Sequence, residues 1–377
     1  MFIITRKAVV IFILIFAFTF TSSALTSPEV SASSAVLIDA DTLEILYERN
    51  AYERRSMAST TKIMTGIIAV ESGRLNDLVK VKKKPYIEGT AIGFDKGDTL
   101  TVNDLCYAML LESGNDAAVL IAEFLAGSEE KFSVLMNKKA AQLGMENTNF
   151  ITASGLDADV HYTTAYDMAL LGAYAVKNSA FREICSAKSY TAKFVEPEKT
   201  RHFSNHNRLL SSCEGAFGIK TGFTKKSGRC LVSACERMGK TLVAVTLNAP
   251  DDWNDHKRLY DYGYSLYEEG EVKVTFPREI SVRGSDKRTV RLGGADEIKT
   301  VYLKNSTVTS RVYLNKITYA PLDAYDITGK IVIYQNGVPI HEQSVYSLEK
   351  ADIVKNYRTT KRTLFQQLAD YIKDIFF

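Results

Sequence analysis

Ser59 and Lys62 lie three residues apart at the start of an apolar stretch, residues 63–70, that predicts a buried helix. Residues with this spacing share one face of a helix, one turn apart. A serine hydroxyl is a weak nucleophile until an adjacent base takes its proton. We therefore predict that Ser59 is a nucleophile and that the Lys62 amine is the base within hydrogen-bond reach of it.

Lys62 can act as a base only while its amine is neutral. A free lysine has a pKa of about 10.4, so keeping the amine neutral at pH 7 costs roughly 4.6 kcal/mol. Partial burial and a second cation nearby both lower the pKa of a lysine and remove most of that cost. The pair therefore predicts another positive residue in the same site.

The Ser-x-x-Lys spacing also occurs at two other places, so alone it is weak. Ser128 and Lys131 flank two glutamates ahead of a helical apolar pattern, which predicts that Ser128 is a helix N-cap. Ser347 and Lys350 lie in a polar stretch with no apolar helix behind them. What distinguishes Ser59 is the apolar helix that follows it immediately, although a helix start rich in serine and threonine is an alternative explanation.

Ser113-Gly114-Asn115 is the only Ser-x-Asn of the chain and separates two helical runs, residues 103–111 and 116–125. The glycine allows a sharp backbone turn. Such a loop can project a hydroxyl and an amide into a cleft. The alternative is an ordinary connection between helices.

Lys220-Thr221-Gly222 follows residues 217–219, which predict a strand that would hold the Lys220 ammonium steadily in a site. Glycines at 218 and 222 leave room for another backbone to approach closely. A second match to this pattern, residues 226–228, lies in a polar stretch and predicts a turn.

Together the three segments match, in order and in structural context, the signature Ser-x-x-Lys, Ser-x-Asn, Lys-Thr-Gly of penicillin-recognising serine enzymes. More narrowly, the chain resembles the serine-type D-alanyl-D-alanine carboxypeptidases, which are low-molecular-mass penicillin-binding proteins. The resemblance covers most of residues 35–350, including 34–39, 58–65, 111–117, 161–169 and 205–210. It implies an α/β fold in which an antiparallel sheet is flanked by helices and carries a helical insertion, followed by a small all-β domain and a C-terminal amphipathic helix.

The resemblance also implies a reaction and roles. The reaction removes the terminal D-alanine from peptidoglycan stem pentapeptides through an acyl-serine, without a cofactor, and β-lactams acylate the same serine. The backbone N–H groups of Ser59 and Phe223 would form the oxyanion hole. Ser113 would bridge the two lysines and relay a proton to the departing amine, Asn115 would orient Lys62, and Lys220 and Thr221 would bind the terminal carboxylate. The expected site is catalytic Ser59, Lys62, Ser113 and Asn115, with substrate-binding Lys220, Thr221, Gly222 and Phe223.

One departure concerns an arginine that some relatives place just past the last of these strands. Residues 248–253 contain no arginine. Arg208 is a possible substitute, to which we assign no role at this stage.

Three other functions were weighed against this one. A β-lactamase of the same fold needs efficient deacylation, which class A enzymes obtain from a loop glutamate, and residues 147–167 contain none. A non-catalytic wall-binding scaffold would not need the intact triple signature. A Ser/His/Asp hydrolase is disfavoured because no Gly-x-Ser-x-Gly is present and the five histidines form no recognisable constellation.

Composition indicates a large folded protein. The 377 residues are 46% hydrophobic and 24% charged, enough for two domains with sizeable cores. A net charge of +3 gives no argument for nucleic acid, and the basic run at residues 80–84 is best explained as a solvated turn. Five cysteines imply no complete disulfide framework, and none has metal-ligand spacing with the histidines, so we predict no metal site. Cys230 and Cys235 lie five apart on one predicted strand, so they face opposite sides and cannot bond each other.

The two ends of the chain predict export and membrane contact. Arg6-Lys7, thirteen apolar residues (8–20) and Ser22-Ser23-Ala24 are typical of a secretory signal over residues 1–24, although retention as an uncleaved anchor is an alternative. Residues 353–377 have apolar side chains at helical spacing among basic ones, which favours an amphipathic helix on the outer face of the cytoplasmic membrane. The alternative is a terminal helix that docks on the β-rich domain.

Between these ends we expect a catalytic domain, residues 25–270. It would contain a hairpin (35–39, 44–48), helices from 59 to 177 interrupted at 84–101, an antiparallel meander (217–222, 229–236, 241–248) and a closing helix (253–267). Short β-prone runs then suggest a small sandwich or barrel over 271–352. These runs are 272–276, 280–282, 289–292, 299–303, 310–317, 325–327 and 331–334. This domain lacks all three signatures, so we assign it spacing, anchoring or partner contact.

Overall fold

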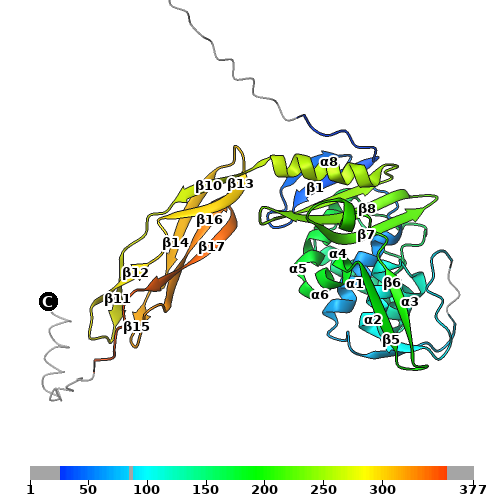
Figure 1. Ribbon diagram of the computed structural model, residues 1–377, viewed down its shortest axis with the longest axis horizontal. Coiled ribbons are helices and arrows are strands. Elements are labelled where there is room, and N and C mark those ends of the chain that lie inside the picture. The colour runs from blue at the N-terminus through cyan, green and yellow to red at the C-terminus, as the bar shows by residue number, and fades with distance from the viewer. Residues whose placement is uncertain (1–25, 85–87, 355–377) are drawn as a thin grey trace, which may run out of the picture.

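The computed structural model describes residues 26–84 and 88–354 and contains an α/β body followed by a β-rich region (Figure 1). The predicted signal (1–24) and residues 355–377 of the predicted membrane helix lie outside the described residues. Within the described part of the chain, no helix combines the length and apolar character needed to cross a bilayer.

A five-stranded antiparallel sheet forms the centre of the α/β body, in the order β2-β1-β9-β8-β7. The N-terminal hairpin joins the later meander because β1 pairs with β9, from Ser34 opposite Leu247 to Asp39 opposite Leu242. The predicted hairpin and meander are thereby confirmed. The strands are β1 (Ser34–Asp39), β2 (Ile45–Arg49), β7 (Ala216–Thr224), β8 (Gly228–Arg237) and β9 (Lys240–Leu247).

Helices cover both faces of this sheet. α5 (Ala165–Lys177) packs on β1, β8 and β9 from one side, together with the insertion, and α8 (Asp252–Ser265) packs on the other side. The predicted closing helix is therefore present, but it ends before Tyr267, which already belongs to a strand. Apolar side chains from both sheet faces fill two cores, one under α8 and a larger one under α5 and the insertion.

The insertion between β2 and β7 is mainly helical, as expected. Thr101 caps its second helix through a reciprocal capping box with Asp104, and Ser128 caps the fourth, as predicted. Its helices are η1 (Ala58–Thr61), α1 (Lys62–Glu71), α2 (Val102–Leu111), α3 (Asn115–Ala126), α4 (Glu129–Gln142), α6 (Ser179–Ser186) and α7 (Leu209–Ser212). It also holds two small antiparallel pairs that we did not predict, β3 (Leu78–Lys80) with β4 (Thr99–Thr101) and β5 (Ser189–Phe194) with β6 (Lys199–Ser204).

The β-rich region contains a six-stranded sheet in the order β14-β16-β17-β12-β11-β15 and a separate pair, β10 with β13. Its main core is apolar and includes Phe276, Ile298, Ile331, Ile333 and Val345. The expected small β-sandwich agrees with this arrangement, with corrections described below. The strands are β10 (Tyr267–Lys273), β11 (Glu279–Arg283), β12 (Thr289–Gly293), β13 (Glu297–Leu303), β14 (Val308–Leu314), β15 (Thr318–Tyr319), β16 (Ile327–Gln335) and β17 (Val338–Ser347).

Three sequence expectations for this region differ from the structure. β16 runs from Ile327 to Gln335, so it contains the run predicted at 331–334 but only the last residue of the run predicted at 325–327, and β17 was not predicted at all. β17 carries polar residues and a proline on an exposed face, so its sequence lacks the apolar run we sought. The predicted domain division after residue 270 falls inside β10.

The two regions are joined directly at β10. Tyr267 donates a hydrogen bond of 2.6 Å to the buried carboxylate of Asp39 in β1. Gln335 donates another, of 3.0 Å, to Glu44 in the loop between β1 and β2. These contacts connect the β-rich region to the edge of the sheet opposite β7.

Candidate active site

Ser59 lies in η1, and Lys62 opens α1 directly behind it. One helical turn separates the side chains, and the Lys62 Nζ lies 2.8 Å from the Ser59 Oγ. The predicted hydrogen-bond distance is therefore present before any substrate arrives. Ala58, just before Ser59, has a φ of 48°, a left-handed conformation that a non-glycine residue adopts only under constraint.

The Lys62 amine has three oxygen neighbours. Besides Ser59 Oγ, they are Asn115 Oδ1 at 2.7 Å and the Ser154 carbonyl oxygen at 2.6 Å. Both of the latter can only accept, whereas Ser59 can donate. A neutral amine has two N–H donors and one lone pair. It satisfies Asn115 and Ser154 with its donors, which leaves the lone pair directed at the Ser59 hydroxyl.

Burial favours that neutral state. Lys62 is fully buried, and this burial is the largest cause that holds its pKa well below the usual value. The charge of Lys220 lowers the pKa further, while the carboxylate of Asp116 opposes the shift. The second cation predicted from the sequence is thus present, but it ranks behind burial, and burial is complete rather than partial.

Ser154 is a contact that the sequence did not indicate, because its contribution comes from the backbone. Two hydrogen bonds fix its loop, one from Thr65 Oγ1 to the Ala153 oxygen (2.7 Å) and one from Ala153 N to Glu129 Oε1 (2.8 Å). Gly155 follows with a φ of 86°, and a β-carbon there would lie 2.0 Å from the Ala58 oxygen. The loop therefore approaches η1 as closely as backbone permits.

His161 also holds this loop in place through hydrogen bonds and is not a catalytic base. Its Nδ1 accepts the Ile151 N–H at 2.9 Å, so the ring proton is on Nε2, which lies 3.0 Å from Thr61 Oγ1. Burial lowers the pKa of His161 to about 4, so the ring is neutral at physiological pH.

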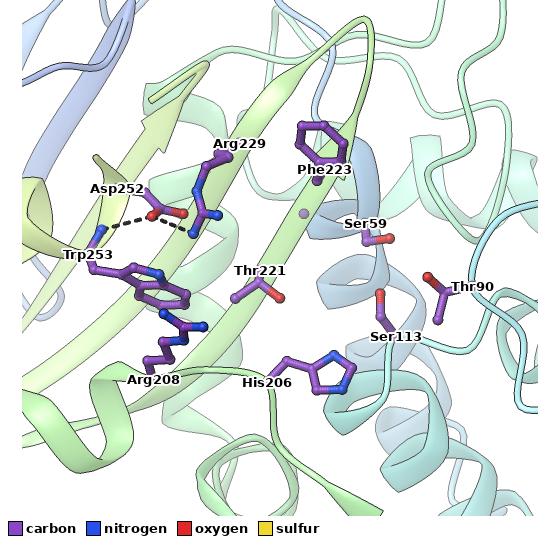
Figure 2. Close-up of a pocket in the computed structure, with 11 residues that line it drawn as sticks. Ser59, Thr90, Ser113, His206, Arg208, Thr221, Phe223, Arg229, Asp252 and Trp253 are labelled. Carbon is purple, nitrogen blue, oxygen red and sulfur yellow. Dashed lines mark hydrogen bonds and ion pairs between the residues drawn. The ribbon is translucent and has the colours of Figure 1, made fainter. Parts of the chain in front are cut away.

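Ser113 lies in the turn between α2 and α3, and Asn115 is the first residue of α3. Asn115 Nδ2 donates to the Glu88 oxygen at 2.8 Å, which turns Oδ1 toward Lys62. Ser113 has a φ of 63° and faces the cavity opposite Ser59 (Figure 2). Within the described residues its hydroxyl makes no hydrogen bond to Lys62 or Lys220, so the bridge that we expected is not formed in this structure.

β7 carries the third segment and is the edge strand of the sheet nearest η1. Lys220 is buried, its Nζ donates to the Thr221 oxygen at 3.0 Å, and burial lowers its pKa to about 7. A β-carbon on Gly222 would lie 3.0 Å from the Ser59 nitrogen, so a side chain here would push η1 and β7 apart by a few tenths of an ångström. This close approach agrees with the reason predicted for the glycine.

These elements enclose an open cavity of about 350 Å³ (Figure 2), a size that suits a short peptide. Five of the eight predicted site residues line it: Ser59, Ser113, Thr221, Gly222 and Phe223. Lys62, Asn115 and Lys220 lie buried behind that lining. The sequence-predicted residues are therefore brought together. Among the described residues, no group of three or more His, Cys, Asp or Glu side chains is placed to hold a metal.

The far end of the cavity contains side chains that we missed (Figure 2). Arg229 in β8 forms an ion pair with Asp252 at 2.8 Å and lies 5.6 Å from the centre of the Trp253 ring. Its Nε is buried without a hydrogen-bond partner among the described residues. Arg208, the possible substitute named from the sequence, lies just before α7 and lines the same end, so it was not missed.

Arg229 was missed because the expected arginine was one within residues 248–253, whereas Arg229 lies on the neighbouring strand. The Ala249 N–H donates to the Arg229 oxygen at 2.9 Å, so β8 runs alongside that segment. A prediction of the β8–β9 register would have placed Arg229 here.

Comparisons with known proteins agree with this site. Residues 21–251 match the family described as D-alanyl-D-alanine carboxypeptidase. The chain is 33% identical over 350 residues to D-alanyl-D-alanine carboxypeptidase DacC of Escherichia coli, and the match covers 86% of each protein. It is 29% identical over 348 residues to D-alanyl-D-alanine carboxypeptidase DacF of Bacillus subtilis, and that match covers 88% of this chain and 89% of DacF. Penicillin binding protein 5 from Haemophilus influenzae superposes with a TM-score of 0.62 at 28% identity over 87% of this chain and 99% of that protein. A Streptomyces DD-transpeptidase superposes with a TM-score of 0.61 at 32% identity, over 64% of this chain and 100% of the other.

Proposed function

Because the chain belongs to the D-alanyl-D-alanine carboxypeptidase family of serine peptidases, we propose that Ser59 is its nucleophile and Lys62 the base that activates it. The reaction of this family removes the terminal D-alanine of peptidoglycan stem pentapeptides and is blocked by β-lactams. The observation that carries the assignment is the set of oxygens around Lys62 Nζ, in which the Ser59 hydroxyl is the only group that can also donate a hydrogen bond. Lys62 takes the Ser59 proton as the oxygen attacks the carbonyl between the two D-alanines.

The oxyanion of the tetrahedral intermediate forms beside the backbone of η1 and β7. We assign its stabilisation to the N–H groups of Ser59 and Phe223, since the edge strand presents backbone groups next to the nucleophile. Removing one such donor in other enzymes costs roughly 3–4 kcal/mol of transition-state stabilisation. The close packing at Gly222 sets the spacing between the two donors.

Ser113 carries the proton to the leaving amine in this proposal. Its hydroxyl faces Ser59 across the cavity, where the departing nitrogen would lie. Asn115 keeps Lys62 oriented through its Oδ1 and binds the substrate amide. The substrate itself then connects Ser113 to the rest of the catalytic group.

The terminal carboxylate of the substrate belongs at the Thr221 end of the cavity. Lys220, which is buried behind the cavity lining, supplies positive charge. The Thr221 hydroxyl donates a hydrogen bond directly to the carboxylate. We extend this predicted pair with Arg229 and Arg208, because a guanidinium binds a carboxylate through two parallel hydrogen bonds. Asp252 holds Arg229 in position. Arg229 would then take the place of the arginine that residues 248–253 lack.

Release of D-alanine from a synthetic pentapeptide, followed by mass spectrometry, tests the reaction. Penicillin tests the site and the distinction from a β-lactamase. The opened β-lactam ring stays attached and blocks water, and residues 147–167 offer no glutamate to activate another one. We expect a penicilloyl adduct on Ser59 that lasts for at least minutes and that Ser59→Ala abolishes. Rapid multiple-turnover hydrolysis of penicillin would overturn the assignment in favour of a β-lactamase.

We also propose that the protein is exported and held at the outer face of the cytoplasmic membrane. The support is the sequence pattern of residues 1–24 and 353–377, together with exposed apolar side chains where the described chain ends. Tyr319, Tyr325, Ile327 and Ile353 are all more than half exposed, and Ser285, beside β11, pairs with Ile353. Deleting residues 355–377 should release the protein from membranes without loss of peptide hydrolysis. Unchanged membrane retention after signal removal would contradict this anchor.

A further inference from the structure

Two of the five cysteines lie side by side, away from the catalytic serine. Cys213 follows α7 and Cys235 lies in β8. Both sulfur atoms contact the same carbonyl oxygen, that of Glu214, at 3.9 Å for Cys213 and 3.3 Å for Cys235. The Glu236 N–H also donates to the Gly215 oxygen at 2.9 Å, so the backbone after Cys213 runs beside the backbone of Cys235.

The environments of the two thiols are complementary. Cys213 is partly exposed, and Arg237 donates to its sulfur at 3.5 Å. A hydrogen bond from Cys235, helped by the Arg237 charge, lowers the pKa of Cys213 to about 7. The same contact and burial raise the pKa of Cys235. Cys213 is therefore the attacking thiolate and Cys235 the thiol held behind it.

The other three cysteines have the opposite character. Cys106, Cys185 and Cys230 are buried, and burial raises their pKa to about 12, 12 and 11. Buried thiols of high pKa are inert toward exchange. The chain therefore offers one reactive pair and three internal controls.

We propose that Cys213 and Cys235 are a redox-active dithiol that closes to a disulfide by exchange with a small-molecule disulfide. The Cys213 thiolate attacks one sulfur of the external disulfide and expels the first thiol, which leaves a mixed disulfide on Cys213. Cys235 then loses its proton, attacks the Cys213 sulfur and expels the second thiol. The protein dithiol gives up two electrons and two protons, and the external disulfide becomes two thiols.

This bridge would enclose the whole of β7, which carries Lys220, Thr221 and Gly222. It would fasten the turn between α7 and β7 to β8, so the strand beside Ser59 could not leave the sheet. Closing a loop of this length constrains the unfolded chain. We therefore expect the oxidised protein to melt about 5 °C or more above the reduced protein.

The test treats reduced, folded, full-length protein with oxidised glutathione, traps remaining thiols with an alkylating agent and measures intact mass and disulfide-linked peptides. We expect two fewer alkylated thiols, a linked pair of peptides containing Cys213 and Cys235, and a rate that rises as pH increases through about 7. A stable glutathione adduct on wild-type Cys213, or reaction only after unfolding, would overturn the proposal.

Three variants make the result specific. Cys235→Ser should stop at the mixed disulfide on Cys213, and Cys213→Ser should not react. Cys185→Ser, a change of a buried thiol near the same strand, should close at the wild-type rate. Equal protection of Cys185 and Cys213 in the wild-type protein would contradict a selective pair, and a Cys235→Ser variant that behaves as wild type would exclude Cys235 as the partner.

Discussion

The α/β body and the β-rich region bury different kinds of side chain. Among the described residues, every buried lysine, aspartate and histidine lies before residue 267, including Lys62, Asp116, His161, Lys220 and His256. The main core of the β-rich region consists of aliphatic and phenylalanine side chains. Burying ionisable groups opposes folding unless they are paired or neutralised. The α/β body therefore carries a cost in stability from buried ionisable groups, of which Lys62 and Lys220 belong to the catalytic site, and the main core of the β-rich region has no such cost.

The largest effect that tests this comparison comes from Lys62→Arg. The charge is kept, but a guanidinium cannot deprotonate near neutral pH and so cannot take the Ser59 proton. We expect acylation by both peptide and penicillin to fall by about 10⁴-fold or more, measured by intact mass over time. Lys131→Arg, on the exposed side of α4, is the control and should change nothing. Acylation within tenfold of wild type would mean that a group other than Lys62 is the base.

Ile333→Ala should lower the stability of the β-rich region and leave the chemistry of the α/β body unchanged. Ile333 is fully buried in the apolar core of the β-rich region, so truncation should cost about 2–5 kcal/mol of stability there. Urea unfolding followed by limited proteolysis would locate the loss, and the rate of Ser59 acylation should not change. The exposed Ile317→Ala should cost less than about 0.5 kcal/mol. A parallel loss of acylation would show that the regions are not energetically separate.

Arg229→Met should affect substrates that carry a free carboxylate. We expect kcat/KM for such peptides to fall about 10- to 100-fold, because a carboxylate loses a charged hydrogen bond worth roughly 1.5–3 kcal/mol, while uncharged esters change little. Arg278→Met, which breaks an exposed ion pair with Asp296 in the β-rich region, is the control for loss of an arginine away from the cavity. Equal losses on acids and esters would indicate that Arg229 only supports the fold.

The smallest predicted effect is the pH dependence of stability due to Lys220. Unfolded lysine has a pKa of about 10.4, whereas burial lowers the pKa of Lys220 to about 7 in the folded protein. Between these values the unfolded chain binds more protons, so the free energy of unfolding should rise with pH, by roughly 1 kcal/mol per unit. Because the pKa of buried Lys62 is also lowered, Lys220→Met should reduce the slope between pH 7 and 9 rather than abolish it, and the exposed Lys330→Met should leave the slope unchanged. An unchanged slope in Lys220→Met would assign the dependence to another group.

The sequence predicted those parts of the site that depend on the spacing of residues near one another in the chain or on a short motif next to a recognisable helix or strand. The Ser59–Lys62 contact follows from one helical turn, and the close approach of Gly222 follows from its lack of a side chain. The contact between Lys62 and the Ser154 carbonyl oxygen could not be predicted, because every residue type carries the same backbone oxygen. Arg229 reaches the cavity only through the register of β8 against residues 248–253, which local patterns do not encode.

The fold was predictable to a similar depth. The meander was found because short turns separate strongly apolar strands. β5, β6 and β17 were missed because their exposed faces are polar and their pairing, rather than their own sequence, makes them strands.

Gly155 and Gly222 approach η1 from two sides, and this has a consequence for how the sequence can drift over evolutionary time. Neither position contributes a functional group, yet a side chain at 155 would run into the Ala58 oxygen and one at 222 would press on the backbone of Ser59. In a saturation library selected for β-lactam binding, position 155 should accept glycine alone, and position 222 should accept alanine only with reduced acylation. The residues least free to vary near the nucleophile would then include two that have no side chain to lose.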